Sequence, residues 1–314
     1  MNKFIKQAAL EVGFDACGIA KADLLIEDAG FMTQWLSEVQ HGSMSYLERN
    51  FEKRTDPRLL VPGCKSVIVV LLNYFNAENQ PEGAPKFAKY AWSASDYHQV
   101  IKYKLSELEN LIVKQYGNEC FNQQVQHSFV DSAPVLERRW AQRAGLGWIG
   151  KHTQLIANGL GSYCFIGTLM MNAETNYDEP SPDRCGKCTR CINACPTSAL
   201  NGRSLNARKC ISYQTIENRE EVEPDIRGKL SGRVLGCDIC AEVCPWNKKW
   251  ATNHRHSELL PVGEILKHKN EDWENLTIGE FNSIFKNSAV RRVKYQKLME
   301  NISYVSGKNI NTDI

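Results

Sequence analysis

The chain has 314 residues, of which 24% are charged and 42% hydrophobic, and its formal net charge is +2. At about 150 residues per domain this length suggests two domains, and the composition excludes disordered, collagen-like and low-complexity proteins. The longest apolar run, 67–72, is far shorter than the ~20 residues of a membrane span. Charge and glycine near the start argue against a signal peptide, so we expect a cytoplasmic protein without membrane contact. The near-zero charge gives no support for bulk coating of nucleic acid but allows a local basic patch.

Residues 1–175 have the pattern of an α/β unit. A continuous β-branched run at 66–72 predicts a strand buried on both faces, and apolar residues at helical spacing predict a helix over 97–116. Pro134 is expected to begin a further helix that ends near residue 144. Strands that alternate with helices favour an open sheet covered by helices. The other expected elements are a helix at 31–40 and strands at 125–130 and 163–170.

A glycine-rich loop follows, and its residues 145–150 match the pattern G-x-G-x-x-G. A dinucleotide fingerprint follows a strand and opens a helix, whereas here a predicted helix precedes the loop and the bulky Trp148 occupies its turn. The pattern therefore does not predict nicotinamide binding. Six glycines between Gly145 and Gly167 indicate close backbone approach, either to a large cofactor or within a tightly packed loop.

The twelve cysteines are unevenly distributed, because eight of them lie between residues 185 and 244. The first motif is Cys185-x2-Cys188-x2-Cys191-x3-Cys195-Pro, the run with which bacterial ferredoxins bind a [4Fe–4S] cluster and contribute the fourth cysteine to a second one. Zinc ribbons use two Cys-x2-Cys pairs, which three successive cysteines at this spacing fit poorly. Disulfides need an oxidising compartment. The motif therefore predicts iron–sulfur clusters.

The second motif, Cys237-x2-Cys240-x3-Cys244-Pro, lacks one cysteine, and the isolated Cys210 is the obvious replacement. Eight thiolates are the ligands of two cubes. By the same crossover, one cluster is expected on Cys185, Cys188, Cys191 and Cys244, and the other on Cys195, Cys210, Cys237 and Cys240. The remaining thiols have no ligand spacing and are expected to be structural: Cys17, Cys64, Cys120 and Cys164.

Asp131 follows the predicted strand 125–130 and is a candidate acid. In an open α/β sheet, ligands bind at the carboxyl ends of the strands. Apolar neighbours there could raise the pKa of a carboxyl group enough for it to donate a proton near neutrality. The alternative is that Asp131 caps the next helix. Its position alone does not separate these two roles.

Several motifs together resemble the epoxyqueuosine reductase family, from about residue 10 to 305. They are KRTDP at 53–57, DYH at 96–98, DSAPVLER at 131–138, GLGWIGKH at 145–152, the two cysteine motifs, and F-x3-F-x2-SA-x2-R-x-K at 281–294. This family depends on cobalamin and reduces the epoxide on the modified wobble base of tRNA, which is the last step of queuosine synthesis. The chain resembles a short form without the C-terminal helical-repeat domain, and it has His152 where members often have Asn.

The resemblance implies a mixed α/β fold in three segments. Residues 1–175 would form a cobalamin-binding catalytic domain similar to nitroreductases and reductive dehalogenases, residues 176–250 a ferredoxin-like domain with two [4Fe–4S] clusters, and residues 251–314 a helical segment. It also implies that Asp131 is the proton donor. The residues implied to contact cobalamin are Arg54, Tyr97, His98, Asp131, Gly150, Lys151, Gln154, Gln214 and Asp238.

The resemblance further implies tRNA as the substrate, with an external one-electron donor such as flavodoxin or ferredoxin. We expect a monomer. A basic stretch late in the chain and scattered cations near the cysteines are candidates for phosphate contact, although such runs are also common on solvated surfaces. These are Lys286, Arg291, Arg292, Lys294 and Lys297, and Arg203, Arg208, Lys209, Arg227, Lys229 and Arg233.

Two other functions stay open at this point. A cobalamin and iron–sulfur reductive dehalogenase would use the same cofactors, but those enzymes typically carry a twin-arginine leader, which this N-terminus lacks. A plain ferredoxin-type electron-transfer protein would need only the cysteine segment and would leave residues 1–175 and Asp131 without a role.

Overall fold

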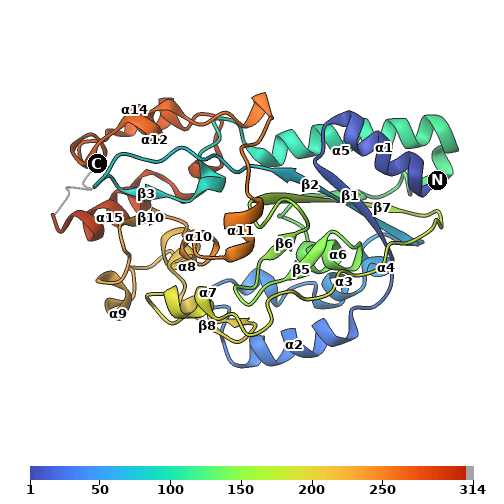
Figure 1. The fold of residues 1–314 in the computed structure, drawn as a ribbon, viewed down its shortest axis with the longest axis horizontal. Helices are drawn as coiled ribbons and strands as arrows, with labels where there is room; N and C mark the ends of the chain where they lie inside the picture. Colours follow the sequence, from blue (N-terminus) through green and yellow to red (C-terminus); the bar gives the residue numbers. More distant parts are fainter. Residues whose placement is uncertain (309–314) are drawn as a thin grey trace.

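A computed structural model describes residues 1–308 of the chain, and it has mixed α and β structure (Figure 1). This confirms the predicted fold class. In the described residues no helix is both long enough and apolar enough to span a bilayer.

A four-stranded sheet in the order β1-β2-β7-β4 forms the centre of the first half of the chain. All three strand pairs are antiparallel. The rule for the carboxyl ends of parallel strands, from which Asp131 was first considered, therefore does not apply to this sheet. The strands are β1 (Ala16–Lys21), β2 (Ser66–Asn73), β4 (Ser128–Phe129) and β7 (Cys164–Met171).

The central strand β2 is buried at every residue, as its continuous apolar run predicts. Because side chains alternate across a strand, Ile68 and Val70 pack on one face of the sheet while Val67 and Val69 pack on the other. Helices cover both faces, and the sheet is the middle layer between them (Figure 1). This agrees with the predicted arrangement of a sheet covered by helices.

One face is covered by α1 (Asn2–Val12) and α5 (Tyr97–Tyr116). The other is covered by α6 (Glu137–Arg143), whose Trp140 is fully buried against the sheet. Helix α5 has the predicted bounds, since Asp96 caps its first turn and Gly117 ends it. The remaining helices before the sheet's second strand are α2 (Ile26–Ser37), η1 (Ser45–Leu47), α3 (Phe51–Thr55) and α4 (Pro57–Leu60).

The glycine-rich loop forms a hairpin of β5 (Gly147–Ile149) and β6 (Leu155–Ala157). A Cβ at Gly147 would lie 2.1 Å from the carbonyl oxygen of Ile156, and Gly145 has a φ of 73°. Close packing within the loop therefore accounts for these glycines, and the G-x-G-x-x-G pattern opens no helix.

The cysteine segment consists of short elements joined by loops, and a helical segment follows it. The cysteine segment contains α7 (Arg190–Ala194), β8 (Leu200–Asn201), β9 (Ser204–Leu205), η4 (Ala207–Lys209), α8 (Ile211–Ile216), α9 (Pro224–Arg227), β10 (Arg233–Leu235), α10 (Ile239–Glu242) and α11 (Pro245–Trp250). The last segment contains η5 (Ser257–Leu259), α12 (Gly263–Lys267), α13 (Asn270–Glu274), α14 (Ile278–Ile284), η6 (Ala289–Val293) and α15 (Tyr295–Ser306).

A second hydrophobic core contains residues from all three predicted segments. Strand β3 (Lys86–Phe87) pairs in parallel with β10, and η2 (Lys89–Ala91) follows it. Phe87 packs on Trp273 and Phe285, with ring centroids 4.9 and 6.1 Å apart. Residues of β10 and α15 complete this core, which lies on the side of the molecule opposite the N-terminus (Figure 1). The boundaries at 175 and 250 stay a prediction.

Candidate active site

A cavity of about 510 Å³ lies where four parts of the fold meet: the start of α5, the end of β4, the first residues of β7 and the 3₁₀ helix η6. Four of the predicted site residues line it: Tyr97, His98, Asp131 and Gln154. Arg291 and Arg292 from the predicted basic stretch line it as well. The fold therefore brings together residues that are distant in the sequence, with a carboxylate, an imidazole and a phenol in one place.

Asp131 is held by two side chains of the first turn of α5. The Tyr97 hydroxyl donates to Oδ2 of Asp131 at 3.0 Å, and Nε2 of His98 lies 3.3 Å from the same oxygen. Asp131 itself has a φ of 56°, the left-handed conformation that non-glycine residues rarely adopt. Its side chain is about half exposed, at 51%, so it can reach a ligand in the cavity while keeping these contacts.

His98 is fixed from its other side by Asp96. Nδ1 of His98 lies 2.7 Å from Oδ1 of Asp96, and the same oxygen accepts the backbone N–H of His98 as the N-cap of α5. Tyr97 stacks on Phe165 of β7 with ring centroids 4.0 Å apart and nearly parallel planes. The helix cap and the aromatic stack therefore orient both side chains toward Asp131.

The charges in this network set the pKa values of its members. Hydrogen bonding from His98 lowers the pKa of Asp131, against the effect of burial, and Tyr97 adds to this. This is the opposite of the raised pKa that the sequence suggested. Burial would lower the pKa of His98, but its hydrogen bonds to Asp131 and Asp96 outweigh that effect and raise the pKa to about 9. At neutral pH the proton therefore resides on His98 and the negative charge on Asp131.

Glu137 is a member of this site that the sequence analysis missed. Its Oε1 accepts the backbone N–H of Asp131 at 2.7 Å, and it lines the same cavity. Burial, followed by the charge of Asp131, raises the pKa of Glu137 to about 8. Its place in DSAPVLER, six residues after Asp131, was a signal for proximity, but the first turn of a helix offered an ordinary explanation for an acid there.

A second cavity, of about 230 Å³, adjoins the first and extends to the cysteines of the second motif. Tyr97 and Gln154 line both cavities, and Cys237, Asp238 and Cys240 line the second. Burial raises the pKa of Asp238 to about 6. Cys237 and Cys240 and the Asp131 network thus line two adjoining cavities that share Tyr97 and Gln154.

Several of the eight predicted cluster ligands lie near one another, although no three acid, histidine or cysteine side chains of residues 1–308 are arranged to hold a metal ion. The thiols of Cys185 and Cys188 lie close enough to act on the pKa of Cys244, which burial raises. In the same way Cys237 and Cys210 act on the pKa of Cys240, but so does Cys191 of the other expected set. Cys185 and Cys244 act on the pKa of Cys191, and Cys195 acts on that of Cys210. The assignment of the eight cysteines to two crossed sets stays a prediction.

The other residues predicted to contact cobalamin lie outside the two cavities. Arg54 donates to the carbonyl oxygen of Tyr46 at 3.3 Å, and its Nε is buried without a partner among the described residues. Gly150 begins the turn of the β5–β6 hairpin, where a Cβ would crowd Ile156. Gln214 is fully buried and binds the carbonyl oxygen of Arg208 through its side-chain amide.

Lys151 contacts the first cysteine motif. Its Nζ donates to the carbonyl oxygens of Gly186 and Cys188 at 2.7 and 3.0 Å. This contact between the hairpin and the cysteine loop could not be predicted from the sequence, because no local pattern joins the two segments.

The predicted phosphate-binding cations divide into two groups. Five of them form ion pairs with acids of the protein: Arg203, Arg227, Arg233, Arg292 and Lys297. The others make no ion pair within residues 1–308: Arg208, Lys209, Lys229, Lys286, Arg291 and Lys294. Of the second group, Arg291 lines the 510 Å³ cavity.

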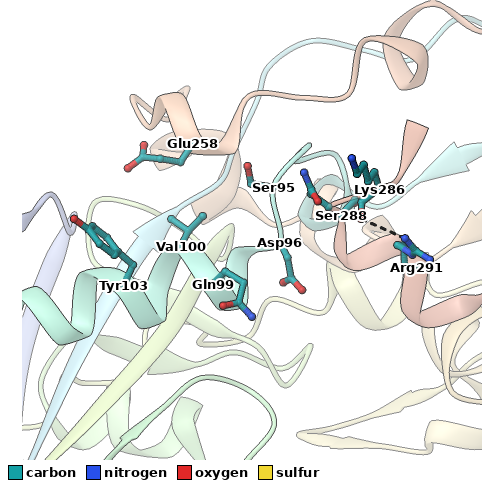
Figure 2. A pocket seen from close by; sticks show the side chains of 10 residues that line it. Ser95, Asp96, Gln99, Val100, Tyr103, Glu258, Lys286, Ser288 and Arg291 are labelled. Atoms are coloured by element: carbon teal, nitrogen blue, oxygen red, sulfur yellow. Dashed lines mark hydrogen bonds between the residues drawn. The ribbon is translucent and has the colours of Figure 1, made fainter. Parts of the chain in front are cut away.

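A further pocket of about 680 Å³ lies beside this cavity, and Asp96, Ser288 and Arg291 line both. Figure 2 shows helix α5, with Gln99 and Tyr103, on one side of the pocket, and the segment with Lys286 and Arg291 on the other. The pocket therefore extends the site outward from Asp131 toward unpaired cations.

Residues 184–247 match the family of 4Fe-4S double cluster binding domains. The chain is therefore an iron–sulfur protein of the double-cluster class. Residues 54–132 match a family described as epoxyqueuosine reductase QueG, DUF1730. The epoxyqueuosine reductase of Cellulophaga algicola is 44% identical over 97% of this chain and 97% of its own length. The chain belongs to the epoxyqueuosine reductase family, whose members are oxidoreductases.

Solved structures of this family are also similar to the chain. An epoxyqueuosine reductase with a tRNA-Tyr epoxyqueuosine-modified tRNA stem loop matches with a TM-score of 0.82 and 29% identity, over 96% of this chain and 80% of that one. The Bacillus subtilis enzyme, with its catalytic aspartate loop swung out of the active site, matches with a TM-score of 0.84 and 29% identity, over the same shares of the two chains.

Proposed function

We propose that this protein reduces the epoxide of epoxyqueuosine at the wobble position of tRNA to the alkene of queuosine. The observation that carries this is that the cavity of the Asp131–His98–Tyr97 network adjoins a second cavity lined by Cys237 and Cys240 of the second cysteine motif. Membership of the family and the stem loop held by a solved relative support the same substrate. A plain electron-transfer protein would have no use for the acid network.

The cofactors that this proposal requires fit the residues present. The number and spacing of the eight cysteines between residues 185 and 244 suit two [4Fe–4S] clusters. A large polar cofactor such as cobalamin suits the two adjoining cavities, both of which are lined by Tyr97 and Gln154, whereas Arg54 lies outside them. When bound, cobalamin supplies a strongly reducing, nucleophilic metal centre and the clusters supply one-electron relay.

The reaction consumes two electrons and two protons, and the epoxide oxygen leaves as water. Asp131 would deliver a proton to that oxygen, which is the role of a positioned general acid. Because the resting proton resides on His98, we propose that His98 protonates Asp131 as the oxygen departs. Asp96 would stabilise His98 throughout, in the way that a carboxylate orients an imidazole in other acid–base sites. In the Bacillus subtilis relative the aspartate loop moves, which supports a working role for this loop.

The tRNA would be held where unpaired cations adjoin the cavity. Lys286 and Arg291 flank the pocket in Figure 2 and are free to contact phosphates. Reaching the wobble base at Asp131 requires that the nucleotide leave its stack, which single-stranded loops allow at modest cost. We also propose a cytoplasmic monomer that receives electrons from an external one-electron donor such as flavodoxin or ferredoxin.

The test is anaerobic reconstitution with iron, sulfide and cobalamin, followed by reaction of the reduced protein with a stem loop that carries epoxyqueuosine. Mass spectrometry of the nucleosides is expected to show the loss of one oxygen. Cobalamin binding is followed separately, by its visible absorbance in gel filtration. A protein that holds both clusters and cobalamin and binds the stem loop, yet removes no oxygen, contradicts the proposal.

A further inference from the structure

The two groups of thiols differ in their surroundings. Cys237 and Cys240 of the second group line the 230 Å³ cavity. In the first group Cys188 is exposed, and no cysteine of the loop 185–191 lines either of the two cavities described above. Within the first group it is therefore Cys188 that faces solvent, and its loop does not line the cavities of the Asp131 network.

Cations surround the exposed thiol. Arg184, Lys187 and Arg190 are all exposed, and none forms an ion pair within the described part of the chain. Lys249 joins them through Trp246: its Nζ lies 5.8 Å from the indole centroid, and the indole N–H donates to the carbonyl oxygen of Arg184 at 3.2 Å. We call these four cations the basic collar. They are available to bind anionic groups.

The acids closest to the collar in sequence are already engaged. Asp183 forms an ion pair with Arg203, and Glu242 forms one with Arg233 at 2.7 Å. The collar thus keeps a net positive charge at the surface around Cys188, although the whole protein has a net charge of only +2. A surface of this kind attracts a partner of opposite charge and orients it during encounter.

The surface is also preformed. Lys151 anchors the loop 185–191 through hydrogen bonds from its Nζ to the carbonyl oxygens of Gly186 and Cys188. Trp148 is fully buried beside Cys185 and Cys244, with Trp246 and Trp250 packed on its edge. A partner that docks here meets a loop whose backbone is already fixed, so little backbone ordering opposes binding.

We infer that the basic collar around Cys188 is the docking surface for a small acidic one-electron carrier protein. This rests on the proposed function, because the reduction of one epoxide needs two electrons from outside. Each encounter would oxidise the carrier by one electron and reduce this protein by one. Two encounters therefore supply one turnover, while the two protons come from solvent.

Docking of a protein here, and not of RNA, is favoured by the position of the collar. None of its cations lines the Asp131 cavity or the pocket in Figure 2, where the RNA must be held for the wobble base to reach Asp131. An electron carrier instead needs close approach to an exposed cluster ligand, and the exposed Cys188 lies between Lys187 and Arg190 of the collar. The carrier and the tRNA would thus occupy different surfaces and could bind together.

The test compares two double charge reversals in the cluster-reconstituted protein. The collar variant is Lys187→Glu with Arg190→Glu, and the matched control is Lys3→Glu with Lys114→Glu, two exposed cations on α1 and α5 without ion pairs in residues 1–308. The probe is an acidic flavodoxin, whose Kd is measured by calorimetry at low salt. We expect at least about tenfold weaker binding for the collar variant, and an unchanged Kd for the control.

Four further measurements separate the role of the collar from the reaction itself. Iron content, turnover with dithionite and affinity for the stem loop are expected to be unchanged in the collar variant, whereas turnover driven by flavodoxin falls. An unchanged flavodoxin Kd overturns the inference, and a loss of stem-loop affinity instead shows that the collar binds RNA. Failure of the wild-type protein to reduce epoxyqueuosine with dithionite would count against the proposed function, while the flavodoxin Kd would still report on the collar.

Discussion

The backbone N–H of Asp131 donates a 2.7 Å hydrogen bond to Oε1 of Glu137, and this bond holds Asp131 in a left-handed conformation. A non-glycine residue in that conformation costs about 1–2 kcal/mol, so the bond must offset a local strain. This hydrogen bond also places the Glu137 carboxyl group beside Asp131, where it does not contact the side-chain oxygens of Asp131. Glu137 is therefore a positioning residue for the loop that begins at Asp131.

Replacement of Glu137 separates its role as an acceptor from its charge. Glu137→Gln keeps a carbonyl oxygen for the Asp131 N–H and is expected to retain turnover within a few-fold. Glu137→Leu removes the acceptor and should reduce turnover about 10- to 100-fold, because a hydrogen bond to a charged or buried acceptor contributes about 1.5–3 kcal/mol. Single-turnover rates with the epoxyqueuosine stem loop measure both variants. Equal losses in the two variants would contradict the positioning role.

Asp131→Asn tests the proposed acid directly. The amide keeps the shape of the side chain but cannot release a proton to the epoxide oxygen, so turnover is expected to fall by about 100-fold or more. Stem-loop affinity, iron content and cobalamin absorbance should remain at wild-type values. Full turnover by this variant would remove Asp131 from the mechanism.

The raised pKa of His98 predicts a pH-dependent contribution to stability. Its folded-state pKa of about 9 lies above the ordinary value of 6.5, so the stabilisation is complete below pH 6.5 and is lost as the pH rises through 9. Compared with His98→Gln, the wild type should be more stable by about 2 kcal/mol near pH 6 and by almost nothing above pH 10. Thermal unfolding of both reconstituted proteins across this pH range measures the difference in their stability. Other titrating groups contribute equally to the two proteins and cancel in this difference. A difference independent of pH would contradict the ion pair.

Pairs of cysteine substitutions test the crossover between the two motifs. Cys188→Ala and Cys244→Ala are expected to remove the same cluster, so the double variant should retain about four irons. Combining Cys188→Ala with Cys210→Ala should remove both clusters and almost all iron. Iron analysis and EPR of the reduced proteins distinguish these results. Loss of both clusters in the first double variant would show that the sets are assigned wrongly.

The unpaired cations beside the cavity should contribute to RNA affinity. Lys286→Ala and Arg291→Ala are each expected to weaken stem-loop binding several-fold and to lower the slope of log K against log salt by about 0.7. Arg227→Ala is the control, because Arg227 is paired with Glu221. Fluorescence anisotropy at several salt concentrations gives both quantities. A slope that changes equally in all three variants would contradict this placement of the RNA.

Local patterns predicted the elements that are stabilised by their own sequence. The helix over 97–116 matched α5 because Asp96 and Gly117 supply both of its ends, and the apolar run at 66–72 matched β2 within one residue. The expected strand at 125–130 is reduced to Ser128–Phe129, since it pairs only with β7 at the edge of the sheet. Helix α1 and strand β1 were missed, and they are held by tertiary packing against α5 and β2.

The site was predictable in its parts but not in its arrangement. The motifs named Tyr97, His98 and Asp131, yet nothing local shows that two side chains of α5 bind a carboxylate more than thirty residues later. The direction of the Asp131 pKa shift depends on this contact, and the sequence therefore suggested the wrong direction. The cysteine spacing was more informative, because short loops restrict where thiolates can lie.

The contact of Phe87 with Trp273 and Phe285 has a consequence for how the protein is made. The ribosome releases residue 87 long before residues 273 and 285. The second core therefore closes after every cysteine of both motifs has emerged, although the first sheet can already have folded. A premature stop after α11 would therefore leave Phe87 without its aromatic partners, and the truncated chain would be prone to aggregation and proteolysis.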